Sequence, residues 1–147
     1  MKRIVIAIAI FTSGILLASC APQVAVSQGQ IVVGTGDYSQ IAGTWLGVVD
    51  QYNTSTVYSA QINFFSAPTE NGQVATSNYP ELGCGGILYA RPAEGNTYVT
   101  LEEITFGGGC ISGTTKKFTP TLTGELIYEY FNTPTSARGG DAVLVKQ

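Results

Sequence analysis

The chain has 147 residues, of which 44% are hydrophobic and only 12% charged, and it contains 18 glycines and no histidine. This composition is typical of a folded chain of strands and turns rather than of a disordered one. The lack of histidine excludes the serine and cysteine triads that use histidine as their base, and it removes the commonest metal ligand. We therefore expect a protein that is not an enzyme and that has no metal site and no cofactor.

The first 20 residues are typical of an export leader. Residues 2–3 are basic, and an uncharged stretch of 16 residues follows at 4–19. About 20 apolar residues are needed to span a bilayer, so this stretch suits a signal peptide better than a permanent anchor. It ends in Leu17-Ala18-Ser19-Cys20, which resembles the bacterial lipobox. The resemblance implies cleavage before Cys20 and acylation of that cysteine; an ordinary secretory signal is the alternative.

The same resemblance implies a location. Two or three acyl chains anchor a protein stably, and position 21 is alanine rather than the aspartate associated with inner-membrane retention. We therefore expect a lipid anchor in the bacterial cell envelope, at the outer membrane. Residues 20–42 have little periodicity and are expected to form the lipidated N-terminus and a flexible tether, with a reach of roughly 25 Å.

Charge limits the partners. Removal of residues 1–19 leaves five basic and ten acidic residues, a net charge of −5. The basic residues are scattered, whereas nucleic-acid binding needs a concentrated basic surface. We expect contact with the membrane through the lipid, an envelope or extracellular protein partner, and no nucleic acid.

From residue 43 onward the pattern predicts a single β domain, 43–147. Apolar and polar residues alternate, as at Tyr58, Ala60, Ile62 and Phe64, and Gly-, Pro- and Asn-rich turns separate the segments. The strands are expected at 43–52, 57–66, 73–79, 85–91, 97–106, 110–120, 124–131 and 141–146. Eight short strands predict a small antiparallel up-and-down barrel, because closure leaves no exposed edge. A two-sheet β-sandwich is the alternative.

Two motifs carry resemblances to known proteins. Gly43-Thr44-Trp45 resembles the G-x-W that opens the first strand of lipocalins and avidin-like barrels, which implies that Trp45 closes one end of the barrel. Residues 79–86 (YPELGCGG), followed by Gly109-Cys110, resemble a module that recurs in bacterial exported proteins. That resemblance supports the fold and the compartment, and it implies no activity.

Cys84 and Cys110 are the two cysteines left once Cys20 is acylated. A pair of cysteines in an exported chain predicts a disulfide. A hairpin centred on residues 94–95 would place Thr105 opposite Cys84, so the bridge should fasten the glycine-rich turn 107–109 onto the start of the fourth strand. A reactive or metal-binding thiol pair is the alternative.

The interior of the predicted barrel is expected to be filled by side chains, because eight strands enclose little space. The aromatic residues expected to line it are Trp45, Tyr58, Phe64, Tyr98, Tyr128 and Tyr130. If Val99 and Leu101 face inward, Glu103 does too, and a buried carboxylate needs a cation. Arg91, on the neighbouring strand, is the expected partner, and we favour a structural ion pair over a ligand anchor.

These features predict a lipid-anchored envelope lipoprotein with a non-catalytic β-barrel binding domain that recognises its ligand through exposed loops such as 66–72 and 132–140. One alternative is an inhibitor of a basic hydrolase such as lysozyme, because known lysozyme inhibitors include small disulfide-bonded β-barrel lipoproteins and a net charge of −5 suits a basic enzyme. A second alternative is a lipocalin-like carrier of a small apolar ligand.

Overall fold

The computed structural model describes residues 36–52 and 54–147. The expected signal peptide, Cys20 and most of the expected tether lie outside the described residues. The strands are β1 (Gly43–Gln51), β2 (Thr56–Phe64), β3 (Gln73–Tyr79), β4 (Cys84–Glu94), β5 (Thr97–Phe106), β6 (Thr114–Pro120), β7 (Leu126–Phe131) and β8 (Arg138–Lys146). The 3-10 helices are η1 (Tyr38–Ile41) and η2 (Pro80–Leu82). Within this described part of the chain, no helix is long and apolar enough to cross a membrane.

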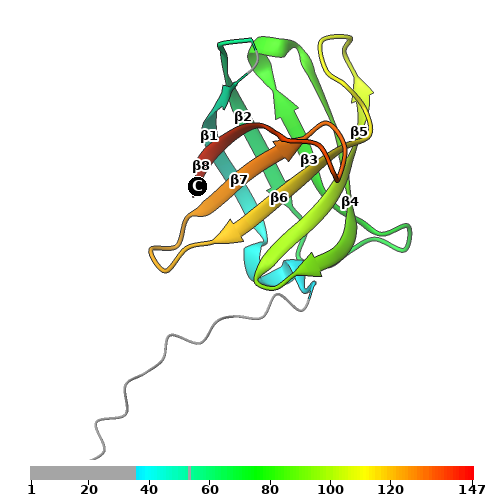
Figure 1. Cartoon of the computed structure of the whole chain (residues 1–147). Helices are drawn as coiled ribbons and strands as arrows, with labels where there is room; N and C mark the ends of the chain where they lie inside the picture. The colour runs from blue at the N-terminus through cyan, green and yellow to red at the C-terminus, as the bar shows by residue number, and fades with distance from the viewer. Residues whose placement is uncertain (1–35, 53) are drawn as a thin grey trace, which may run out of the picture. The chain divides into compact units, whose positions relative to one another are not determined.

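The strands form one closed barrel (Figure 1). Each strand pairs antiparallel with the next, and β1 also pairs with β8, with Trp45 opposite Lys146 and Gln51 opposite Gly140. This confirms the eight-stranded antiparallel barrel and excludes the sandwich. The largest difference from the expected bounds is in β6, which begins at Thr114 rather than at residue 110 because residues 107–113 form a loop.

Alternation along the strands places one face of each in the core. In β2, Tyr58, Ala60, Ile62 and Phe64 are buried, and the residues between them are not. The residues predicted to line the interior are all buried, namely Trp45, Tyr58, Phe64, Tyr98, Tyr128 and Tyr130. Phe64 packs edge-on against Phe118 with ring centroids 4.9 Å apart. Aromatic side chains therefore fill much of the barrel, as the sequence predicts.

Helix η1 closes one end of the barrel, at the bottom of Figure 1. Tyr38 and Ile41 are only 1% and 3% exposed. The Tyr38 hydroxyl donates a hydrogen bond to the Val99 carbonyl oxygen (2.6 Å), and the Trp45 indole N–H donates to the Ile41 carbonyl oxygen (2.7 Å). Trp45 therefore lies at the closed end.

The domain begins earlier than residue 43, where the sequence placed its boundary. Tyr38 and Ile41, expected to belong to the flexible tether, are part of the barrel core. The sequence hides this because a helix of four residues is too short to show a periodic apolar stripe.

Tyr38 gives a test of this closed end. Burial raises the pKa of Tyr38 to about 12, whereas a tyrosine in an unfolded chain ionises near pH 10. The stability that this group contributes is therefore fully present below pH 10 and is lost as the pH rises toward 12. We expect Tyr38→Phe to lose about 2–3 kcal/mol less stability than the wild type between pH 10 and 12, measured by urea unfolding across that range. Parallel pH profiles for the two proteins would contradict the burial of this hydroxyl.

Candidate binding site at the open end of the barrel

The end of the barrel opposite η1 is not covered by that helix, and we call it the open end. In an up-and-down barrel the β1–β2, β3–β4, β5–β6 and β7–β8 connections share this end, which lies away from η1 in Figure 1. Of the two loops expected to carry recognition, the one at residues 132–137 lies here, whereas 66–72 joins β2 to β3 at the closed end. The two loops therefore cannot form one binding surface.

A cavity of about 90 Å³ lies at the open end. Strand residues in its lining are Gln51, Tyr58, Tyr79, Glu102, Thr114, Lys116 and Tyr130. The lining residues outside the strands are Leu82, Gly109, Cys110, Ile111 and Asn132. Pockets for drug-sized ligands start at about 300 Å³, and one water occupies about 30 Å³ of liquid. The cavity is therefore large enough for one small chemical group and too small for a whole ligand.

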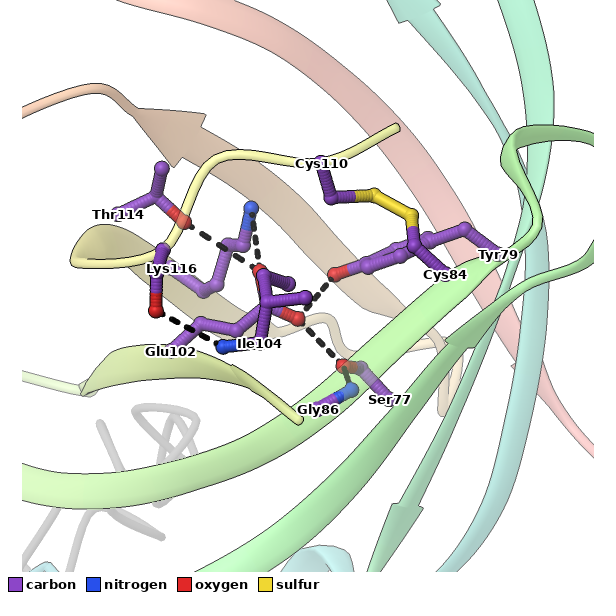
Figure 2. The surroundings of a disulfide bond; sticks show 10 residues. Ser77, Tyr79, Cys84, Gly86, Glu102, Ile104, Cys110, Thr114 and Lys116 are labelled. Carbon is purple, nitrogen blue, oxygen red and sulfur yellow. Dashed lines mark hydrogen bonds and ion pairs between the residues drawn. A yellow bond between two sulfur atoms is a disulfide. The ribbon is translucent and has the colours of Figure 1, made fainter. Parts of the chain in front are cut away.

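Glu102 of β5 lies beside this cavity and is 1% exposed. Figure 2 shows the side chains that contact its carboxylate. Its Oε1 accepts hydrogen bonds from the hydroxyls of Ser77 and Tyr79, the second at 2.8 Å. Its Oε2 accepts from the Thr114 hydroxyl at 3.3 Å and forms an ion pair with Lys116 Nζ at 3.0 Å. Four donors from β3 and β6 therefore satisfy the carboxylate, as burial of a charge requires. We call Ser77, Tyr79, Glu102, Thr114 and Lys116 the polar cluster.

Lys116 of β6 is also buried, at 4% exposed. Its Nζ lies 4.6 Å from the ring centroid of Tyr130 and 5.8 Å from those of Tyr79 and Tyr128. Ammonium groups at such distances are attracted to aromatic faces. Burial lowers the pKa of Lys116, and the carboxylate of Glu102 opposes this shift. The ammonium is thus held between one carboxylate and three tyrosine rings.

Tyrosine hydroxyls surround the same cluster. Burial raises the pKa of Tyr58, Tyr79 and Tyr128, and the nearby negative charge of Glu102 adds to each shift. Among the described residues, the Tyr128 hydroxyl is buried and has no hydrogen-bond partner. These groups keep their protons well above neutral pH, so they can donate hydrogen bonds.

The expected pair of Glu103 and Arg91 is wrong. Both side chains are exposed, Glu103 lies opposite Ile87, and Arg91 lies opposite Val99, several positions further along the hairpin. The error is a shift of one residue, because in β5 the inward series is Tyr98, Thr100 and Glu102. The outward series contains Val99 and Leu101 and is the more apolar of the two, so hydrophobicity selects the wrong face.

Lys116 is a second residue of the candidate site that the sequence analysis missed, after Glu102. Beside Lys117 it resembles an exposed basic pair, but adjacent residues of a strand point to opposite faces. Lys117 points outward and pairs with Glu94 at 2.6 Å. Phe118, which is fully buried, is the signal that could have placed Lys116 and Thr114 on the inward face.

Cys84 and Cys110 lie at disulfide-bonding distance, with Cα atoms 6.1 Å apart, and Figure 2 shows them joined beside the polar cluster. Bulges shift the register of the β4–β5 hairpin, so Phe106 lies opposite Gly85 and the turn comes next to Cys84. A Cβ at Gly107 would collide with the carbonyl oxygen of Gly83 and lie 2.8 Å from the Cys84 Cα. The glycine-rich turn therefore packs on the start of β4, as predicted, and the cysteine pair lies at the loop that lines the cavity.

A second hollow, of about 400 Å³, lies on the outer surface of β1 and β2. Its lining includes Leu46, Val48, Gln61 and Pro80 and no charged side chain. It is separate from the polar cluster because these residues face away from the barrel interior.

No family model, curated protein or solved structure matches the chain. Among residues 36–52 and 54–147, no group of three His, Cys, Asp or Glu side chains could hold a metal ion. The geometry of the open end is therefore the basis for the function proposed below.

The two adjacent glutamates allow a matched test of the buried pair. Glu102→Gln leaves Lys116 buried without its counter-charge, so we expect a loss of about 3–5 kcal/mol of stability. Glu103→Gln changes an exposed residue and should shift the stability by less than about 0.5 kcal/mol. Urea unfolding at pH 7 measures both variants, and equal losses would contradict the inward position of Glu102.

Proposed function

We propose that the protein is a lipid-anchored lipoprotein of the bacterial cell envelope whose barrel is a non-catalytic binding module, with the open end as its binding surface. The lipobox-like Leu17-Ala18-Ser19-Cys20 supports the anchor, and the difference between the two ends of the barrel supports the choice of binding surface. Helix η1 and Trp45 fill the closed end, whereas the open end holds a cavity beside a buried ion pair. A barrel that only had to fold would gain little from two charges at that position, because their desolvation is costly.

The state of the charged groups supports binding rather than catalysis. A general acid or base must be free to exchange a proton with a substrate. The carboxylate of Glu102 is already engaged by four donors, and the ammonium of Lys116 is paired with it. Both groups therefore hold the site in shape and leave no carboxylate ready for proton transfer in the cavity.

The size of the cavity favours recognition at the surface over transport inside the barrel. A carrier of a small apolar ligand would need at least about 300 Å³, and the cavity at the open end has about 90 Å³. The net charge of −5 for residues 20–147 favours a basic protein partner, of which a hydrolase such as lysozyme is one kind.

The proposed location outside the cytoplasm bears on the oxidation state of Cys84 and Cys110. Disulfides persist in the oxidising compartments outside the cytoplasm, so we propose that Cys84 and Cys110 are oxidised in the exported protein. On the chain-entropy model, closing a loop of about this length stabilises a domain by roughly 3–4 kcal/mol. The bridge would keep the β5–β6 loop beside the cavity when no partner is bound.

The lipid anchor is tested by Cys20→Ser. Without the thiol no diacylglycerol can be attached, so the variant should leave the membrane fraction or accumulate as an uncleaved precursor. Fractionation and detergent-phase partitioning measure this, with Cys84→Ser as a variant that keeps the anchor. Normal processing and unchanged detergent partitioning of Cys20→Ser would contradict the proposal.

The open end as the binding surface is tested by photo-crosslinking in intact cells. Ile111 at the open end is 68% exposed and Leu122 in the turn between β6 and β7, at the closed end, is 98% exposed. A photoreactive amino acid at position 111 should give a discrete crosslinked product, whereas the same group at position 122 should not. Crosslinking from position 122 alone would contradict the assignment of the binding end.

A further inference from the structure

We propose that the cavity at the open end binds an uncharged amide group, whose carbonyl oxygen accepts a hydrogen bond from Lys116. This inference rests on the proposed function, because it takes the open end as the binding surface. It adds the chemical class of the group that is recognised there.

Within the polar cluster, the hydrogen-bonding capacity that is left unused is the donor capacity of Lys116. Glu102 receives four donors, which occupy both carboxylate oxygens. A lysine ammonium has three N–H bonds, and within the described part of the chain Lys116 directs one to an acceptor, the carboxylate of Glu102. Gln51 and Asn132 also line the cavity, and their side-chain amides can both donate and accept hydrogen bonds. A group that enters the cavity beside Lys116 is therefore favoured if it accepts a hydrogen bond from the ammonium.

The charge balance of the site selects an uncharged acceptor. Glu102 and Lys116 together are neutral, so a bound carboxylate would leave a net negative charge among buried tyrosines, which is costly. A cationic group would face the ammonium of Lys116 and would find the oxygens of Glu102 already occupied. An amide carbonyl accepts strongly and adds no net charge.

The size and lining of the cavity fit the same group. A volume of about 90 Å³ equals about three waters of the liquid, which is room for the four or so non-hydrogen atoms of an acetamide unit. The rings of Tyr58, Tyr79 and Tyr130 line the cavity, and aromatic faces suit flat groups. The remainder of a larger ligand would lie outside, against Ile111 and the β5–β6 loop.

Three probes of one shape and different charge test the proposal. Acetamide is neutral, acetate is an anion and acetamidinium is a cation. Each is titrated at constant ionic strength into the whole chain, purified in a mild detergent, and followed through backbone amide resonances in NMR spectra. Acetamide should shift the resonances of Cys110, Thr114 and Lys116 saturably, with a millimolar Kd as expected for so few atoms. It should bind at least five-fold more tightly than either charged probe.

Several outcomes would overturn the inference. These are tighter binding of acetate or acetamidinium, no saturable shift with acetamide, and shifts confined to Leu46 and Val48 in the outer hollow. If acetamide fails while position 111 crosslinks to a partner, the proposed function stands and the amide inference falls. If both fail, the open end is not the binding surface.

A pair of variants isolates Lys116. Lys116→Met should lose acetamide binding, and Lys117→Met, which changes the outward neighbour, should keep it. Because Lys116→Met also removes the cation from Glu102, the double variant Glu102→Gln/Lys116→Met provides a site without buried charge. Retained resonance dispersion identifies a folded variant. Wild-type acetamide affinity in folded Lys116→Met, or in the folded double variant, would contradict the role of Lys116.

Two larger probes identify the source of the amide. The acetamido group of N-acetylglucosamine and that of N-acetylglycine amide present the same carbonyl on different molecules. If the cavity receives the amide of a longer ligand, one of them should bind more tightly than acetamide at the same resonances. Weaker binding of both would contradict an amide that is part of a larger ligand.

Discussion

The ion pair between Glu102 and Lys116 inside a closed barrel is the interaction on which the open end depends. Burial removes both charges from water, which has a desolvation cost. Their mutual attraction offsets this cost only when their remaining hydrogen-bonding groups are also satisfied. Ser77, Tyr79 and Thr114 supply the donors for the carboxylate, and tyrosine rings surround the ammonium. The inward faces of β3, β5 and β6 are therefore constrained to carry polar groups at matching heights.

The apolar core at the closed end offsets the desolvation of these two charges. Tyr38, Trp45, Phe64 and Phe118 form an apolar core there, and the helix η1 covers it. The core stabilises the barrel by burial of apolar surface, while the polar cluster gives the other end a defined shape. The Cys84–Cys110 pair then fastens the loop that borders the cavity. The apolar core and the proposed binding surface are thus located at opposite ends of one sheet.

The sequence predicts the fold well because closure of a barrel imposes strict alternation. Strand β2 alternates clearly, and its buried residues can be identified from the pattern alone. Strand β5 is different, because both of its faces contain apolar residues, and the inward face contains the glutamate. Hydrophobicity therefore assigns Glu103 to the interior in place of Glu102. Helix η1 could not be predicted for another reason. Its two buried residues form no pattern of their own, and they become buried only by packing on the end of the folded barrel.

The candidate site could be predicted only in part. The aromatic lining follows from strand alternation, and the pairing of Cys84 with Cys110 follows from the two cysteines left once Cys20 is set aside. The expected register, with Thr105 opposite Cys84, is wrong because bulges place Phe106 opposite Gly85. The pairing of Lys116 with Glu102 does not follow from the sequence, because it depends on the register of the β5–β6 hairpin, in which Lys116 lies opposite Thr100 and Thr114 opposite Glu102. An adjacent pair of lysines is also typical of an exposed surface. Local pattern identifies the buried residues of a clearly alternating strand such as β2, whereas the partner of a buried charge depends on the register between strands.

The side-chain ammonium of Lys116 offers the most direct test of the buried pair, through NMR measurement of its hydrogen exchange and its contacts at neutral pH. A buried ammonium bonded to Glu102 should exchange its hydrogens with water much more slowly than the exposed Lys146. It should also show nuclear Overhauser contacts to the ring of Tyr130, whose centroid is 4.6 Å from Nζ. Exchange as fast as that of Lys146, without contacts to any tyrosine ring, would contradict the buried pair and the binding site built around it.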